Sequence, residues 1–151
     1  MKFLTEKYIL NLYSGKLFDK YRTGTSYYDD FLTWEGRDYK RKAKGLNGRI
    51  HLMSPYEYMY RQHYYGHNGT VQGNTDDEIE KIRKELHNPN LWNSGISTYD
   101  YFEDILKSGK RLPMPYLNLA NSSQEGRHRA VYAMEKGEKE IPVLVVTEFD
   151  N

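Results

Sequence analysis

The chain has 151 residues, a net charge of +1 at neutral pH and no cysteine. This length predicts a single domain that can bury a core, and a charge near zero disfavours general binding to a nucleic-acid backbone. Without cysteine the chain forms no disulfide and no thiolate metal site. The first residues lack the apolar run of a signal peptide, and no stretch has the length of a membrane span, so we expect a cytoplasmic protein with no membrane partner.

The first third of the chain differs in character from the rest. Residues 1–48 are expected to form an N-terminal extension, rich in tyrosine and charge, that packs on a core formed by residues 49–151. Within it, residues 3–13 and 16–22 are predicted to form two short helices or a hairpin, and residues 23–48 to be largely irregular. The whole chain holds 15 tyrosines and 5 phenylalanines. This excess predicts a core with polar margins, or a tyrosine-rich ligand or partner surface.

A basic run lies in the extension. Arg37, Lys40, Arg41, Lys42 and Lys44 fall within eight residues. Charge runs are usually solvated loops, and we expect a loop here. The alternative is a contact for a nucleic acid or a nucleotide phosphate, with Tyr39 stacking on a base.

The next elements are marked by capping residues. A strand is predicted at 49–53 and a helix over 55–65, with Ser54 as the N-cap and Glu57 three residues after it. Glu57 has a second interpretation, because it follows the first strand and could act as a base or hold Mg²⁺ near a phosphate. Residues 66–74, rich in glycine and asparagine, are expected to form a loop.

Two further helices follow in the middle of the chain. A capping box that begins at Thr75 predicts a helix over 75–86, close to the surface, with a thin apolar face of Ile79, Ile82 and Leu86. A third helix begins at Ser97 or Thr98 and ends at Ser108-Gly109. It is expected to bury Tyr101, Phe102, Ile105 and Leu106.

The segment from Gln124 to Ala130 is the most informative part of the sequence. It stands between an apolar strand at 115–119 and a second one at 141–147. It opens a short helix that ends at Gly137 and presents a narrow apolar face of Ala130, Ala133 and Met134. The order strand, helix, strand predicts an α/β (α+β) fold with a small mixed sheet and surrounding helices.

The start of this helix has the character of an anion site. The first N–H groups of a helix have no partner within it, and the helix dipole places positive charge there. Arg127 and Arg129 add two guanidinium groups, and the preceding turn holds Ser122 and Ser123. We therefore predict a phosphate site at Gly126–Arg129. The alternative is that both arginines are ordinary charges on a solvated helix.

These residues also carry a resemblance. Glu125-Gly126-Arg127-His128-Arg129, followed by Ile141-Pro142-Val143-Leu144-Val145-Val146, resembles the signature of the ParB/sulfiredoxin superfamily and is similar to small ParB-like phage proteins. The resemblance covers about residues 112–147, and a weaker likeness to the family's first strand lies at 49–55. It implies a nucleotide-binding core for ATP or CTP, with Mg²⁺ bridging the phosphates. Ser122, Ser123, Gly126, Arg127, His128 and Arg129 would bind the nucleotide.

Two departures limit which activity the resemblance implies. Sulfiredoxin has a nucleophilic cysteine at the position of Arg127, so the absence of cysteine excludes sulfinic acid reduction. Chromosome-partitioning ParB proteins continue into a helix-turn-helix domain, which is not expected here.

Two classes of function follow. In the first, an enzyme hydrolyses ATP or CTP or transfers its phosphoryl group, with Glu125, His128 and Glu57 as candidate catalytic residues. In this class Glu125 is expected to matter more for turnover than for binding; alternatively it pairs with an arginine of the motif. In the second class, a non-catalytic phage protein binds a host protein, a nucleotide signal or DNA. His63 and His67 are spaced for a metal but lack a third ligand, so no metal site is predicted. The oligomeric state stays open.

Overall fold

The computed structural model describes residues 20–22, 46–65, 73–119 and 122–149. Within them the chain forms four helices and six strands. The helices are α3 (Pro55–Tyr65), α4 (Thr75–Leu86), α5 (Thr98–Lys107) and α6 (Arg127–Glu135). The strands are β1 (Tyr21–Arg22), β2 (Leu46–Met53), β3 (Leu112–Pro113), β4 (Tyr116–Asn118), β5 (Ser123–Glu125) and β6 (Ile141–Phe149).

The main sheet has four strands in the order β2-β6-β4-β5. Strand β2 is antiparallel to β6, β6 is parallel to β4, and β4 is antiparallel to β5. Helix α6 connects β5 to β6. These two strands lie on opposite sides of β4, and β6 runs parallel to β4. The expected α+β fold with a mixed sheet is confirmed, and the three predicted strands share that sheet.

The two outer strands differ from the prediction. Strand β2 begins at Leu46, three residues before the expected start. Strand β5 was not expected, because Gln124 and Glu125 were assigned to the helix. Both pair antiparallel with a neighbouring strand, β2 with β6 and β5 with β4. Pairing with another strand, and not local sequence pattern, decides these boundaries.

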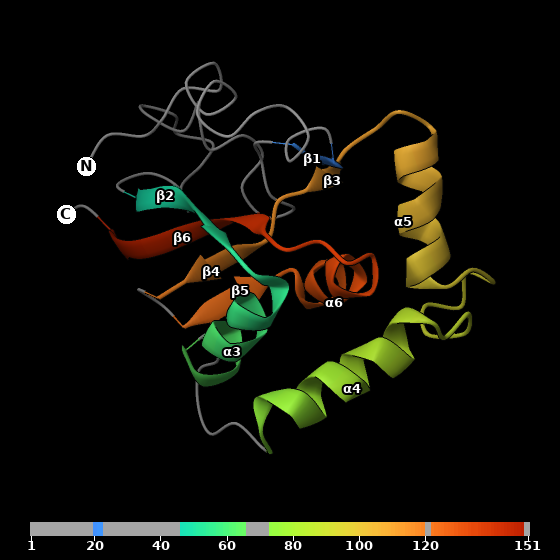
Figure 1. The fold of residues 1–151 in the computed structure, drawn as a ribbon, viewed down its shortest axis with the longest axis horizontal. Helices are drawn as coiled ribbons and strands as arrows, with labels where there is room; N and C mark the ends of the chain where they lie inside the picture. Colours follow the sequence, from blue (N-terminus) through green and yellow to red (C-terminus); the bar gives the residue numbers. More distant parts are fainter. Residues whose placement is uncertain (1–19, 23–45, 66–72, 120–121, 150–151) are drawn as a thin grey trace.

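Helix α6 lies at the centre of the fold, between the sheet and helices α4 and α5 (Figure 1). Ala130 and Ala133 are fully buried as predicted, and Met134 packs against the core. Val131 and Tyr132 are also buried, although they lie off the predicted apolar face. Helices α3 and α4 contact α6, and Tyr132 packs against Tyr99 and Phe102 of α5, with ring centroids 5.2 and 5.4 Å away.

Local capping places the other helices. The Ser54 Oγ accepts a hydrogen bond from the Glu57 N–H at 3.0 Å, and α3 ends at Tyr65 as expected. Helix α4 is capped one residue earlier than predicted, by Asn74, whose side chain accepts from the Asp77 N–H at 2.9 Å. Its apolar face of Ile79, Ile82 and Leu86 is buried as a narrow stripe.

Residue Tyr21 joins this core from the N-terminal part of the chain. Its strand β1 pairs in parallel with β3, and the side chain is 1% exposed. The rest of the predicted extension, including the basic run 37–44, lies outside the described residues, as does most of the loop at 66–74. No helix in the described part of the chain is long and apolar enough to cross a membrane.

Candidate functional site

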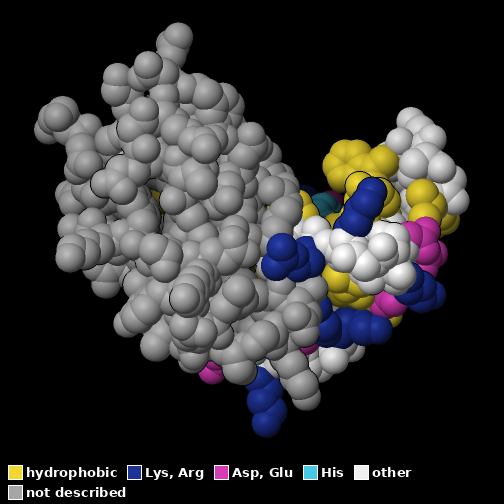
Figure 2. Space-filling view, turned by 90° about the horizontal axis from the view of Figure 1, so that it is seen from above, with side chains coloured by type: hydrophobic (Ala, Val, Ile, Leu, Met, Phe, Trp, Pro, Cys, Tyr) yellow, Lys and Arg dark blue, Asp and Glu magenta, His cyan; other side chains and the backbone are white. Residues whose placement is uncertain are grey.

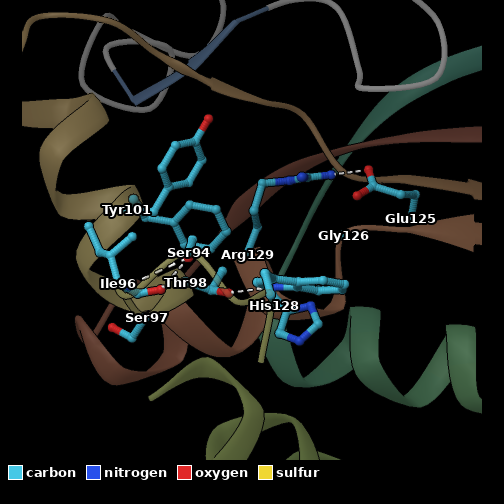
Figure 3. Close-up of a pocket in the computed structure, with 11 residues that line it drawn as sticks. Ser94, Ile96, Ser97, Thr98, Tyr101, Glu125, Gly126, His128 and Arg129 are labelled. Carbon is cyan, nitrogen blue, oxygen red and sulfur yellow. Dashed lines mark hydrogen bonds and ion pairs between the residues drawn. The ribbon is translucent and has the colours of Figure 1, made fainter. Parts of the chain in front are cut away.

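A cavity of about 370 Å³ opens where the start of α6 meets the start of α5 (Figure 3). The strand β5 and the start of α6 contribute Glu125, Gly126, His128 and Arg129. The opposite wall comes from α5 and the turn before it: Trp92, Ser94, Ile96, Ser97, Thr98, Tyr101 and Phe102. This volume falls within the range of small-molecule sites in proteins.

Two helix starts converge on this cavity. Helix α6 has Gly126 as its N-cap, with φ of 135°, no side-chain cap and no acidic residue in its first turn. Helix α5 is capped by Ser97, whose Oγ accepts from the Asp100 N–H at 3.1 Å. The first N–H groups of a helix carry partial positive charge. The start of α5 thus borders the same cavity as the start of α6, although Asp100 in the first turn of α5 offsets part of its dipole.

Arg129 is the cation of this cavity. The residue is only 7% exposed, and its guanidinium forms an ion pair with Glu125, one turn earlier. Figure 3 shows the Arg129 side chain crossing the cavity towards Glu125. The buried Nε has no hydrogen-bond partner among the described residues. A buried unsatisfied donor is costly to the fold, so burial of Arg129 at this position is not explained by packing alone.

Arg127, the other arginine of the motif, does not line the cavity. Its guanidinium contacts Glu78 of α4 at 3.1 Å. Two residues apart on a helix are rotated by about 200°, so Arg127 and Arg129 point to different sides of α6. Glu78 also accepts from Gln62 and lies 3.1 Å from the Nδ1 of His63. Arg127 therefore belongs to a cluster that ties α6 to α3 and α4.

His128 lines the cavity beside Trp92, with ring centroids 6.4 Å apart. Its Nε2 lies 3.3 Å from a carboxylate oxygen of Glu85. Burial lowers the pKa of His128 below its ordinary value of 6.5, and the nearby Glu85 opposes this by raising it. The net lowering favours a neutral ring near pH 7, which can both donate and accept a hydrogen bond.

This lowered pKa predicts a pH-dependent stability. Neutral His128 is favoured in the folded state, so below about pH 6.5 the unfolded chain takes up the proton first. The stability that His128 contributes is present above that pH and is lost as the pH falls through the folded pKa. In urea denaturation at a series of pH values, the difference between wild type and His128→Gln should be constant above pH 6.5 and shrink below it. A difference that does not vary with pH would contradict the assignment.

Besides Arg127, three further predicted site residues lie outside the cavity. The carboxylate of Glu57 pairs with Arg61, one turn later on α3, at 2.9 Å, and does not line the cavity. Ser122, with φ of 56°, lines a separate cavity of about 520 Å³ together with Arg61, Tyr64, Tyr65 and Leu119. Ser123 lies in β5, paired with Asn118 of β4. Glu125, Gly126, His128 and Arg129 are the predicted residues that the structure brings together.

Of the two histidines spaced for a metal, the structure describes His63, which has a structural role. His63 is 1% exposed, and its Nε2 lies 3.1 Å from the carbonyl of Gly73. His67 lies outside the described residues. Among the side chains that the structure describes, no group of three or more His, Asp or Glu is placed to hold a metal ion.

The aromatic wall was missed by sequence analysis. Tyr101 was expected to be buried with Phe102, but it is 55% exposed and borders the cavity. Trp92 is 64% exposed and was assigned no role. Its Nε1 donates to the Oγ1 of Thr98 at 3.0 Å, which fixes the indole at the start of α5. The available signal was an unexplained tryptophan a few residues before a helix cap.

No family model, curated protein or solved structure matches the chain. The geometry of the cavity and the residues of the motif are what point to a ligand in this protein.

Proposed function

We propose that this protein binds a nucleotide in the cavity between α5 and α6. The phosphate would lie at the start of α6, against Arg129 and the first N–H groups of the helix. The base would lie against Trp92 and Tyr101. The observation that carries the proposal is that a single cavity combines a buried cation at a helix start with exposed aromatic side chains on the facing wall.

The resemblance of residues 125–129 to the ParB/sulfiredoxin signature supports the same ligand class and suggests ATP or CTP. Hydrolysis or phosphoryl transfer would need a group that activates water or a hydroxyl. Glu125 is the single carboxylate among the described lining residues, and it is held by Arg129. It could also supply one ligand to Mg²⁺, which is commonly held by one or two carboxylates together with phosphates and water. The metal ion would neutralise negative charge on the phosphate oxygens. Turnover of radiolabelled ATP or CTP would distinguish an enzyme from a binding protein.

The proposal predicts that Arg129→Ala weakens nucleotide binding. Loss of a charge-assisted hydrogen bond worth roughly 1.5–3 kcal/mol corresponds to about a tenfold to hundredfold loss of affinity. Isothermal titration of wild type and variant with ATP and CTP, in excess Mg²⁺, measures this change. Arg129→Lys keeps the charge without the planar fork and should recover part of the affinity.

The matched control is Arg83→Ala. Arg83 pairs with Glu80 and Glu135 and does not line the cavity, so its removal should leave binding unchanged. A thermal melting curve of each variant shows whether the variant is folded. Equal nucleotide affinity in wild type and Arg129→Ala would contradict the phosphate site.

A second candidate function is a non-catalytic protein that binds another macromolecule, such as a host protein or a nucleic acid. The observation that favours it is a row of exposed tyrosines on α3. Tyr56, Tyr60, Tyr64 and Tyr65 are 45–57% exposed. The rings of Tyr60 and Tyr64 lie 4.9 Å apart. Tyrosine is enriched in recognition surfaces because one end is apolar and the other can form hydrogen bonds.

A further inference from the structure

The described lining of the cavity carries little net charge. Arg129 contributes one positive charge and Glu125 one negative charge, and the two pair with each other. His128 is the lining side chain whose ordinary pKa lies near neutral pH, and burial lowers its pKa, which favours the neutral ring. The described lining side chains therefore sum to about zero, and the start of α6 adds the partial positive charge of its helix dipole.

The two helix starts add only a small positive charge. A helix N-terminus is equivalent to roughly half an elementary charge. Helix α6 has no acidic residue in its first turn, whereas α5 has Asp100 in its first turn, which offsets the dipole of α5. Together they supply about half to one positive charge, which complements a single negative charge on a ligand.

The guanidinium of Arg129 marks where that negative charge would lie. Arg129 lines the cavity, and its guanidinium is held in place by Glu125. An anionic oxygen of the ligand would lie against this guanidinium and form a charge-assisted hydrogen bond.

The facing wall is suited to a flat ring. Trp92 and Tyr101 are 64% and 55% exposed, and both border the cavity. In the surface seen from above, hydrophobic side chains gather next to lysine and arginine side chains (Figure 2). Aromatic side chains bind nucleobases by stacking, with little dependence on the base.

Resting on the nucleotide site proposed above, we infer that the cavity takes a nucleobase carried by one singly charged phosphodiester, in preference to a nucleoside triphosphate. Cyclic mononucleotides and dinucleoside monophosphates have this chemistry. A triphosphate brings several further negative charges close to Glu125, and the described lining holds no second cation to balance them. Repulsion between like charges in a partly buried site is strong enough to decide between such ligands.

The test is isothermal titration of the full chain without added Mg²⁺, so that each triphosphate keeps its full negative charge. Cyclic AMP, cyclic CMP and the dinucleoside monophosphate ApA should bind at least about tenfold more tightly than ATP and CTP. The ratio of the affinities for the cyclic mononucleotides and for ApA then shows which kind of phosphodiester the cavity prefers. Tyr101→Ala should weaken the singly charged ligands by about tenfold through loss of stacking. Tyr60→Ala, which removes a similarly exposed tyrosine outside the cavity, should not.

Glu125→Gln tests the charge argument directly. It removes the one negative charge of the described lining, so the preference for the singly charged ligands over ATP should fall by about tenfold. Glu135→Gln makes the same chemical change at the far end of α6, where Glu135 contacts Arg83 and His87, and should leave the preference unchanged.

The outcomes separate this inference from the nucleotide site itself. ATP or CTP binding as tightly as the cyclic nucleotides in wild type would overturn the inference and leave the nucleotide site standing. An unchanged preference in Glu125→Gln would also overturn it. Failure of every nucleotide to bind the folded protein would overturn both.

Discussion

Replacement of Gly126 by alanine is expected to lower the free energy of unfolding by about 3–5 kcal/mol, with a fall in Tm of about 10 °C. Two costs add. The φ of 135° at Gly126 is strained for any residue with a side chain. The added Cβ would also lie 2.5 Å from the Cβ and 2.9 Å from the Cα of Pro115. Because one of these atoms belongs to the backbone, the clash cannot be relieved by a side-chain rotation. Thermal and urea denaturation measure the loss.

Gly137→Ala is the matched control for this prediction. Gly137 follows the same helix and has a positive φ of 74°, but a Cβ there would meet no atom within 4 Å. Its cost should be limited to backbone strain, about 1 kcal/mol. The difference between the two variants isolates the contact with Pro115. Similar losses in both would show that α6 does not start against the segment that leads into β4.

Replacement of Glu78 by alanine is expected to destabilise the fold by about 3 kcal/mol. Glu78 is largely buried and accepts from Arg127 at 3.1 Å, from Gln62 and from the Nδ1 of His63. Its removal leaves these donors without their acceptor in the space between α3, α4 and α6. Urea denaturation at neutral pH measures the change.

Glu80→Ala provides the comparison on the same helix. Glu80 is 55% exposed and pairs with Arg83 on the surface at 3.1 Å. Exposed ion pairs contribute roughly 0–1 kcal/mol, so this variant should be nearly as stable as wild type. If the two variants lose equal stability, the cluster around Glu78 does not join the three helices.

The two predictions concern opposite sides of the motif. Gly126 allows the close approach that places Arg129 in the cavity, and Glu78 holds the neighbouring Arg127 away from it. The motif therefore combines a structural half with a ligand-facing half. A variant of Arg127 should affect stability, whereas a variant of Arg129 should affect binding.

The sequence by itself determined the features that depend on neighbouring residues. Ser54 and Ser97 cap α3 and α5 as predicted, because a cap needs only a side-chain oxygen and an N–H three residues later. The apolar stripe of α4 follows from the helical spacing of its apolar residues, and the strand β6 follows from a continuous apolar run. The glycine also indicates a helix start close to Gly126, although Gln124 and Glu125, expected to open the helix, lie in β5.

Only the tertiary structure decided which side chains meet. The sequence predicted the same phosphate-binding role for Arg127 and Arg129. The packing of α4 against α6 pairs Arg127 with Glu78 and leaves Arg129 in the cavity. Trp92 and Tyr101 lie more than twenty residues before the motif, and they reach it because α5 begins beside α6. Such contacts depend on how elements distant in the chain pack, and local propensity carries no information about that packing.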